Sequence, residues 1–351
     1  MEIIVEAIRT EPDEIELDIP GGEPELVRLS TTAFDNSQNR FVDRFLAVIV
    51  TFFPIVGVVL ANYLHIIGWY TIGWIEVSLC VLMHGLAVAG IELGYHRLFA
   101  HGSYKPNRWV KILFASLGSM GFQGPVIWWA AVHRKHHRHS DRPNDPHSMY
   151  IRPDGRTEYN KGPWQLFLGF IHSHVGWIWT PDSIRSPGWS RYVRDLYRDP
   201  DIWKIHVNYL YFLLAGFLIP GLLGGLLHGN IKGFFLGVLW GGFVRIFTMN
   251  HLTYWSINTL SHSIGSRPYK TADKSTNSIP FIFAVPTFGQ SYHNNHHAFP
   301  TSPIMGHRWY ELDIGKYVLR ALEATGQIRK LNVPSKAQME LKLIKKNKTG
   351  V

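Results

Sequence analysis

The sequence contains one cysteine, Cys80, among 351 residues. A single thiol excludes a disulfide framework, and it excludes a zinc or iron–sulfur site built from cysteines of this chain. The first residues, "MEIIVEAIRTEPDEIELDIP", lack the basic segment and the apolar segment of a secretory signal. No interleaved aromatic and basic residues indicate nucleic-acid binding, and no repeat indicates a solenoid. Histidine and tryptophan, in contrast, are abundant, with 19 and 13 residues.

Charge is unevenly spread over a chain with a formal net charge of +9. Residues 1–43 carry 11 Asp and Glu against 3 Lys and Arg, whereas residues 329–351 carry 7 Lys and Arg against one Glu. Both ends are expected to be solvated tails, and the basic end is also suited to anionic lipid headgroups. We therefore divide the chain into an acidic extension over 1–43, a main domain over 44–328 and a basic tail over 329–351.

Four long apolar runs lie within the main domain, at residues 45–67, 69–95, 205–231 and 233–261. The first has no charged residue, and a helix of its length spans roughly 34 Å, which is enough to cross a bilayer. Glu76 and Glu92 interrupt the second run and Arg245 interrupts the fourth. Because soluble cores rarely hold four such runs, the sequence predicts a membrane protein with two helical hairpins.

Basic residues predict the orientation of these hairpins. Residues 96–204 carry 16 Lys and Arg, and the two short links carry only Lys232. The positive-inside rule places residues 96–204 and both termini in the cytoplasm, so residues 96–204 and 262–328 should form a helical cytosolic cap. The apolar run 107–131 is expected to lie in or on the membrane interface, because a fifth crossing would separate the histidines on its two sides.

Three histidine clusters follow apolar segments on this one side: "HRLFAH", "HRKHH" and "HNNHH". They contain His96 and His101; His133, His136 and His137; and His293, His296 and His297. Positions i, i+3 and i+4 share a helical face, so each H-x2-H-H box is expected to aim its imidazoles at one point. Composition alone would produce such a box about 0.05 times. Imidazole suits iron, zinc, copper and nickel, and eight histidines fit two ions better than one.

A membrane metal transporter is the alternative from another functional class. A transporter should carry its ligands midway along the spans, where the ion crosses, whereas these clusters stand at the span ends on one side. The pattern therefore favours a metalloenzyme with a cavity for a lipid chain.

The motifs "GYHRLFAHGSYK", "VHRKHHRHSDRPNDPHS" and "YHNNHHAFP" resemble those of membrane fatty acid desaturases, most closely the stearoyl-CoA (Δ9) type, over about residues 45–310. The resemblance implies a mostly α fold, with a four-helix membrane bundle and a helical cytosolic cap that holds two Fe²⁺ ions. It adds His262 and Asn258 of "NTLSH" to the eight histidines as ligands, with Asn258 acting through water. Asp145 and His147 of "NDPHS" are expected to support the ligands from outside.

The resemblance also implies a bent acyl tunnel and a headgroup site. Expected tunnel residues are Gln123, Trp129, Trp255, His84 and Val88, and headgroup candidates are Arg134, Lys135, Arg138, Arg152 and Arg156. The chain departs from the animal enzymes at Gly124, Ala131 and Val132, where those enzymes contact CoA, which leaves a glycerolipid or an acyl carrier protein as alternative carriers.

The implied activity is the oxygen-dependent introduction of a cis double bond, with Δ9 of a saturated acyl-CoA favoured. Related alternatives are desaturation at another carbon, acetylenase activity and hydroxylation. No "HPGG" heme motif stands at either end. The electron donor is therefore expected to be a separate ferredoxin or cytochrome b5 with its reductase. A bacterial inner membrane is the favoured location, or the endoplasmic reticulum if the protein is eukaryotic.

Overall fold

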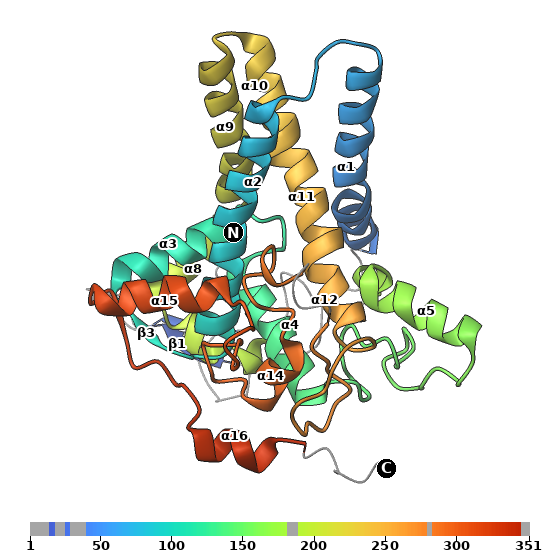
Figure 1. Cartoon of the computed structure of the whole chain (residues 1–351), viewed down its shortest axis with the longest axis vertical. Coiled ribbons are helices and arrows are strands. Elements are labelled where there is room, and N and C mark those ends of the chain that lie inside the picture. The colour runs from blue at the N-terminus through green and yellow to red at the C-terminus, as the bar shows by residue number, and fades with distance from the viewer. Residues whose placement is uncertain (1–13, 18–24, 29–39, 181–188, 279–282, 345–351) are drawn as a thin grey trace.

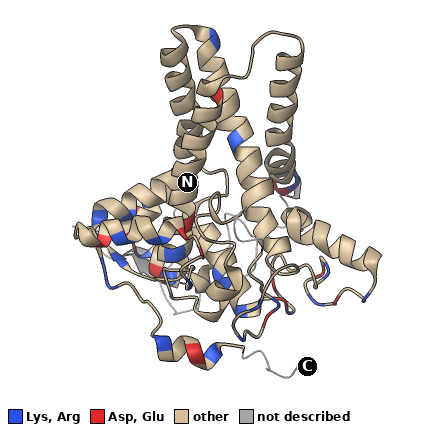
Figure 2. Ribbon diagram, viewed as in Figure 1, with Lys and Arg blue, Asp and Glu red and all other residues tan. Residues whose placement is uncertain are grey.

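The computed structural model describes residues 14–17, 25–28, 40–180, 189–278 and 283–344. These residues are mostly helical, with long helices at one end of the molecule and shorter helices with loops at the other (Figure 1). We call the second part the cap and define it as the described residues 101–208 and 261–344. Lysine, arginine, aspartate and glutamate gather in the cap and are sparse in the long helices (Figure 2).

Within the described residues, four helices are long and apolar enough to cross a membrane: Asp43–Ile66, Trp74–Ala100, Tyr209–His228 and Ile231–Leu260. The predicted membrane-embedded, mostly α fold with four spans is thus confirmed. The first span belongs to α1 (Arg40–Ile66), and the second joins α2 (Trp74–Ala89) to the π-helix η2 (Gly90–Ala100). The third is α9 (Tyr209–His228). The fourth comprises α10 (Ile231–Gly237), η5 (Val238–Val244), α11 (Arg245–Phe247), η6 (Thr248–Tyr254) and α12 (Trp255–Leu260).

The two hairpins pack differently. In the second, α9 and α10 lie side by side, and a Cβ atom on Gly237 would stand only 2.0 Å from the carbonyl oxygen of Pro220. Small residues allow such close backbone approach between membrane helices. In the first hairpin, α1 packs against the fourth span rather than closely against α2. The ring centroids of Phe53 on α1 and Phe243 on η5 lie 4.6 Å apart. Figure 1 shows α1 standing apart from α2.

Arg245 lies fully buried in the fourth span. Its guanidinium donates to the backbone carbonyl oxygens of Gly241, Met120 and Gly216 at 3.0, 2.9 and 3.2 Å. These acceptors come from its own helix, from the loop before α4 and from α9. A buried arginine within a membrane segment is costly unless its donors are satisfied, and here carbonyl dipoles satisfy them and tie three segments together.

The cap consists of short helices and loops at the span ends that were predicted to face the cytoplasm. Its helices are α3 (Arg108–Ser119), α4 (Val126–His139), α5 (Pro163–His174), η3 (Gly176–Trp179), η4 (Trp189–Tyr192), α7 (Arg194–Tyr197), α8 (Pro200–Val207), α14 (His293–Ala298), α15 (Ile314–Ala324) and α16 (Lys336–Lys342). The apolar run 107–131 forms α3 and the first part of α4, and it supplies none of the four candidate spans in the described chain. Trp109 on α3 is 74% exposed.

The described residues also form two small antiparallel sheets. β1 (Glu14–Leu17) pairs with β2 (Glu25–Arg28), with Glu14 opposite Arg28, and most of the predicted acidic extension lies outside the described residues. β3 (Lys105–Pro106) pairs with β4 (Ile328–Arg329). In the basic C-terminal segment, most of residues 329–344 are exposed, and the backbone N–H of Ile344 donates to the carbonyl oxygen of Pro268.

Candidate metal centre

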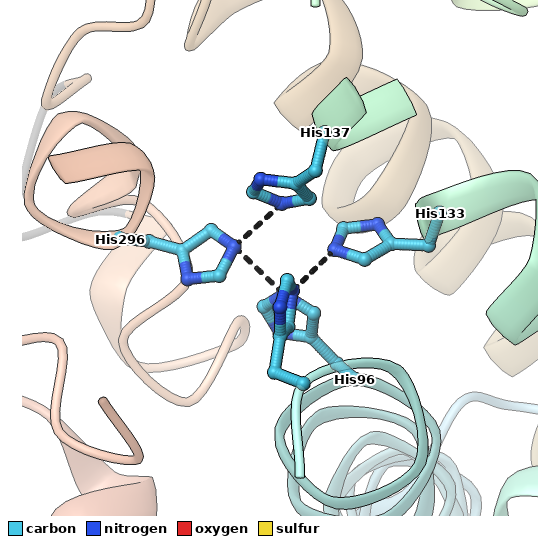
Figure 3. Close-up of side chains that lie close together, drawn as sticks. His96, His133, His137 and His296 are labelled. Carbon is cyan, nitrogen blue, oxygen red and sulfur yellow. Dashed lines mark hydrogen bonds between the residues drawn. The ribbon is translucent and has the colours of Figure 1, made fainter. Parts of the chain in front are cut away.

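Nine histidines from four separate parts of the chain converge on two neighbouring groups. The group of five contains His96, His101, His133, His137 and His296, and the group of four contains His136, His262, His293 and His297. In each group one ligand nitrogen of every member lies within 4.8 Å of the others. Figure 3 shows four rings of the first group, carried by η2, α4 and α14, pointing toward a common centre.

The two H-x2-H-H boxes are divided between the groups. On α4, His133 and His137 belong to the group of five, whereas His136 belongs to the group of four. On α14 the division is reversed, since His293 and His297 join the group of four and His296 joins the group of five. The expectation that each box aims at one point is therefore wrong. At 3.6 residues per turn, position i+4 lies about 40° to one side of position i and position i+3 about 60° to the other.

The wider H-x4-H box is explained by a π-helix. η2 carries i→i+5 hydrogen bonds, and the backbone N–H of His101 donates to the carbonyl of His96 at 3.1 Å. In such a helix a step of five residues brings the chain to nearly the same face. Gly90, the first residue of η2, allows η2 to pack closely on α3, because a Cβ there would stand 2.0 Å from the backbone nitrogen of Gly118.

Nε2 atoms face one another at short range within each group. In the group of five, His296 Nε2 lies 3.1 Å from His96 Nε2 and 2.9 Å from His137 Nε2. His101 Nε2 lies 2.9 Å from His133 Nε2. In the group of four, His293 Nε2 lies 3.1 Å from His262 Nε2 and 3.0 Å from His297 Nε2. Within the described chain, His136 Nε2 is buried without a hydrogen-bond partner.

Four carboxylates accept hydrogen bonds from the outer nitrogen, Nδ1, of four of these histidines. The pairs are His96 with Glu92 (3.1 Å), His136 with Asp145 (2.9 Å), His262 with Asp141 (2.8 Å) and His297 with Asp273 (2.8 Å). A proton held on Nδ1 leaves the lone pair of Nε2 directed at the centre of the group. Three of the four carboxylates serve the group of four.

This arrangement fits metal ions. Because His262 and His297 both present Nε2 lone pairs to His293 Nε2, one proton on His293 cannot satisfy both contacts, whereas a cation between them can. Two nitrogens bound to one ion at about 2.1 Å and at right angles stand about 3.0 Å apart, which matches the observed 2.9–3.1 Å. The donor set is neutral imidazole, which suits iron and other transition metals rather than magnesium or calcium.

Burial favours the neutral form that binds metal. It lowers the pKa of His101 to about 3, and it lowers well below the usual range the pKa values of His133, His136, His137, His293 and His296. His262 is the exception. Burial lowers its pKa, but the charge of Asp141 and the hydrogen bond to it outweigh that effect and raise the pKa.

Asn258 and His147 lie beside these groups with different contacts. Asn258 lines the cavity next to the group of four, and its backbone carbonyl accepts a hydrogen bond from Ser173 Oγ at 2.9 Å. The ring of His147 stacks on that of His136, with centroids 4.3 Å apart. The predicted link between His147 and Asp145 is made by the backbone N–H of His147, 3.2 Å from Asp145 Oδ1, rather than by its ring.

A cavity adjoins both histidine groups. Its wall includes His133 of the group of five and His136 and His293 of the group of four. Three expected tunnel residues, Gln123, Trp129 and Trp255, also line it. The other two lie elsewhere: His84 Nε2 is 3.0 Å from the carbonyl oxygen of Pro286, and Val88 is fully buried in the apolar core.

The five headgroup candidates differ in their contacts and exposure. Arg134 is engaged in holding α4, because its guanidinium donates to the carbonyls of Ala100, Phe99 and Tyr192 and pairs with Asp195 at 2.7 Å. Arg152 donates to Gln165 at 3.0 Å and lies over the ring of Tyr159, while Arg156 is exposed. Lys135 and Arg138 lie on α4.

Sequence reasoning missed three of the four carboxylates. Glu92 precedes His96 by four residues within an apolar run, which was a usable signal, because a carboxylate inside a membrane segment usually has a functional partner. Asp141 stands two residues beyond α4, close to the second histidine box. Asp273 lies 24 residues before His297 and carries no local signal.

Comparison with known proteins agrees with this geometry. The fatty acid desaturase family model matches residues 72–329. The chain is 39% identical over 289 residues to a hex-5-enoyl-[acyl-carrier protein] acetylenase of Moorena producens, a match that covers 82% of this chain and 86% of the relative. It is 32% identical over 268 residues to an sn-1 stearoyl-lipid 9-desaturase of Anabaena variabilis, covering 76% and 87%. It is also 33% identical over 253 residues to a probable acyl-CoA desaturase of Schizosaccharomyces pombe, covering 72% and 48%. The chain therefore belongs to the fatty acid desaturase family.

Proposed function

We propose that the protein is an oxygen-dependent fatty acyl desaturase that introduces a cis double bond, at Δ9 of a saturated acyl-CoA. The nine histidines, with Asn258 through water, would hold two Fe²⁺ ions. One observation carries the proposal: His133, His136 and His293 belong to the two histidine groups and also form the wall of a cavity lined by tryptophans. An acyl chain in this cavity would present its methylenes to both groups.

The electron balance defines the co-reactants. Reduction of O₂ to two waters takes four electrons, of which the substrate methylene pair supplies two and an external donor supplies two. When bound, a pair of iron ions supplies the redox chemistry that removes hydrogen from an unactivated methylene, which no acid or base among side chains can do. The chain itself contributes position and environment.

The four carboxylates keep the protons of their histidines on Nδ1, and this fixes the rings and directs Nε2 toward the centre. Gln123 lines the cavity, and its side-chain amide donates to Asn250 Oδ1 at 2.5 Å, which holds it in place. Trp129 stacks on His133 with ring centroids 5.0 Å apart, so the tunnel wall and a ligand ring are held together. A wall that bends the chain at this point would favour the cis product.

Basic residues of the cap support CoA as the acyl carrier. Lys135, Arg138, Arg152 and Arg156 remain candidates for a phosphate-rich CoA headgroup, since Arg134 is engaged within the fold. In the proposed orientation the cap lies in the cytoplasm, where acyl-CoA and a soluble electron donor are both available. The donor would be a ferredoxin or a cytochrome b5 with its reductase.

Isotope-labelled stearate tests the proposal. The protein is expressed in a desaturase-deficient host with a compatible electron donor, and the products are analysed by mass spectrometry after derivatisation of the double bond. Labelled cis-9-octadecenoate is expected, and its formation should require oxygen. A product with no new double bond, or a double bond at another carbon, would contradict the corresponding part of the proposal.

A second candidate is acetylenase activity on a chain linked to acyl carrier protein. The observation that favours it is the relative of that activity, which matches 82% of this chain at 39% identity. Purified protein supplied with hexenoyl-acyl carrier protein and with stearoyl-CoA in parallel separates the two. Triple-bond formation on the first substrate, with no reaction on the second, would favour the acetylenase.

A further inference from the structure

A cleft of about 490 Å³ lies in the cap and shares no lining residue with the cavity at the histidine groups. Phe299 and Thr301, which follow α14, form one side. Val333, Leu341 and Lys342, from the segment that includes α16, form the other. Figure 1 places α16 at the end of the molecule opposite the membrane spans. The volume of the cleft is within the range of specific binding sites.

The side of the cleft that contains Phe299 is joined directly to the candidate metal centre. Phe299 follows His297 by two residues, so their Cα atoms are within about 8 Å. The backbone N–H of Phe299 donates to the carbonyls of Asn295 and His296, both at 3.0 Å. His296 belongs to the group of five and His297 to the group of four. Phe299 is therefore connected to both groups through a few covalent and hydrogen bonds.

The lining of the cleft includes apolar side chains and the basic residue Lys342, and the segment that carries α16 is basic. Leu341 is 82% exposed and Val333 is 42% exposed. Lys342 Nζ lies 5.0 Å from the centre of the Phe299 ring. The described residues 329–344 include Arg329, Lys330, Lys336 and Lys342 against a single acidic residue, Glu340, and Figure 2 shows basic residues at both ends of α16. An exposed apolar patch with a charged rim is typical of a transient protein interface.

We propose that this cleft docks a soluble, acidic one-electron carrier protein, which delivers electrons through the Phe299 end of α14. The inference rests on the proposed function. Two carrier molecules each lose one electron, and with two protons from solvent these electrons complete the reduction of O₂ to two waters. The substrate methylene pair supplies the other two electrons and two hydrogens. An acyl headgroup is not the occupant, because the acyl chain must enter the separate tryptophan-lined cavity.

The test uses full-length, metal-loaded enzyme and the double variant Leu341→Glu/Lys342→Glu. Arg198→Glu is the matched control, since Arg198 is an exposed basic residue of the cap outside the cleft. Reduced [2Fe–2S] ferredoxin and reduced cytochrome b5 are each measured for binding by surface plasmon resonance and for their ability to drive turnover. Photoreduced flavin, a small reductant that needs no docking surface, drives turnover in parallel.

The double variant should raise the Kd and the KM for the active carrier at least tenfold at low ionic strength, and the difference should shrink with added salt. Its metal content and its flavin-driven rate should match those of the wild type and of Arg198→Glu. Unchanged carrier binding, failure of the wild type to bind either carrier, or an equal loss of flavin-driven turnover would overturn the docking proposal. A weakened affinity for stearoyl-CoA in the flavin assay would assign the cleft to the acyl carrier instead. Carrier binding without any desaturated product would fault the proposed function and leave the docking site supported.

Discussion

His262 Nδ1 lies 2.8 Å from Asp141 Oδ2, and both side chains are almost fully buried. The same carboxylate oxygen accepts the backbone N–H of Lys274, also at 2.8 Å. Burial raises the pKa of Asp141, but the charge of His262, the hydrogen bond to it and the Lys274 N–H outweigh this and hold the pKa below its usual range. Asp141 therefore stays ionised and fixes the ring of a histidine that follows the fourth span.

Asp141→Asn should weaken metal binding to the group of four. Asparagine keeps an acceptor for Lys274 but loses the negative charge that orients His262, and loss of such a partner typically costs 10–100-fold in metal affinity. Metal titration of the metal-free protein, followed by elemental analysis, checks this. Asp154→Asn is the control, because Asp154 is exposed and accepts hydrogen bonds from Arg156 and Thr157 of its own loop, away from both histidine groups. Two equally tight ions in Asp141→Asn would show that Asp141 has no such role.

His137→Ala should abolish oxygen-dependent double-bond formation and lower the metal content. His137 Nε2 lies 2.9 Å from His296 Nε2 and belongs to the group of five. His139→Ala is a matched control, since His139 lies on the same helix, α4, but outside both groups. Product analysis and iron content are measured on both variants. Full activity in His137→Ala would contradict the assignment of this histidine as a ligand.

The sequence predicted the fold well and the geometry of the centre only in part. Span positions were predictable because twenty or more apolar residues in a row have few alternatives to a membrane helix. The convergence of the nine histidines was expected from the resemblance. The division of each H-x2-H-H box between two groups was not, because it depends on where α4 and α14 stand relative to one another. Asp273 is likewise brought to His297 by the tertiary fold alone, across 24 residues.

The surroundings of other predicted site residues also depend on the tertiary fold. His84 and Val88 were assigned to the tunnel by resemblance, and the fold places His84 beside Pro286 and Val88 in the apolar core. Arg134 sits in a box rich in basic residues, and nothing local distinguishes it from its neighbours. Its three carbonyl acceptors and Asp195 come from segments before and after α4, so its engagement follows from packing.

Trp255→Ala should shift or blur the position of the new double bond. Trp255 is 2% exposed and lines the cavity, and the centroid of its ring lies 4.5 Å from that of His251. Removing it widens the cavity, so the acyl chain can slide, and the variant should also lose about 3–5 kcal/mol of stability. Mass spectrometry of the products locates the double bonds, and Trp109→Ala, at a 74% exposed position, serves as the control. A single unchanged product would remove Trp255 from the positioning wall.

His206 should make the stability of the protein depend on pH outside the metal centre. It lies on α8, stacks on Trp203 with centroids 5.7 Å apart, and burial lowers its pKa to about 4. Between its ordinary value of about 6.5 and about 4, the unfolded chain binds a proton that the folded chain does not, so stability falls as the pH is lowered through this window. One pKa unit corresponds to 1.36 kcal/mol, which limits the effect to about 3 kcal/mol.

His206→Phe keeps an aromatic ring and removes the titration. Thermal unfolding in detergent between pH 7 and pH 4 should therefore show a shallower fall of Tm in the variant than in the wild type, whereas parallel curves would show that His206 titrates normally.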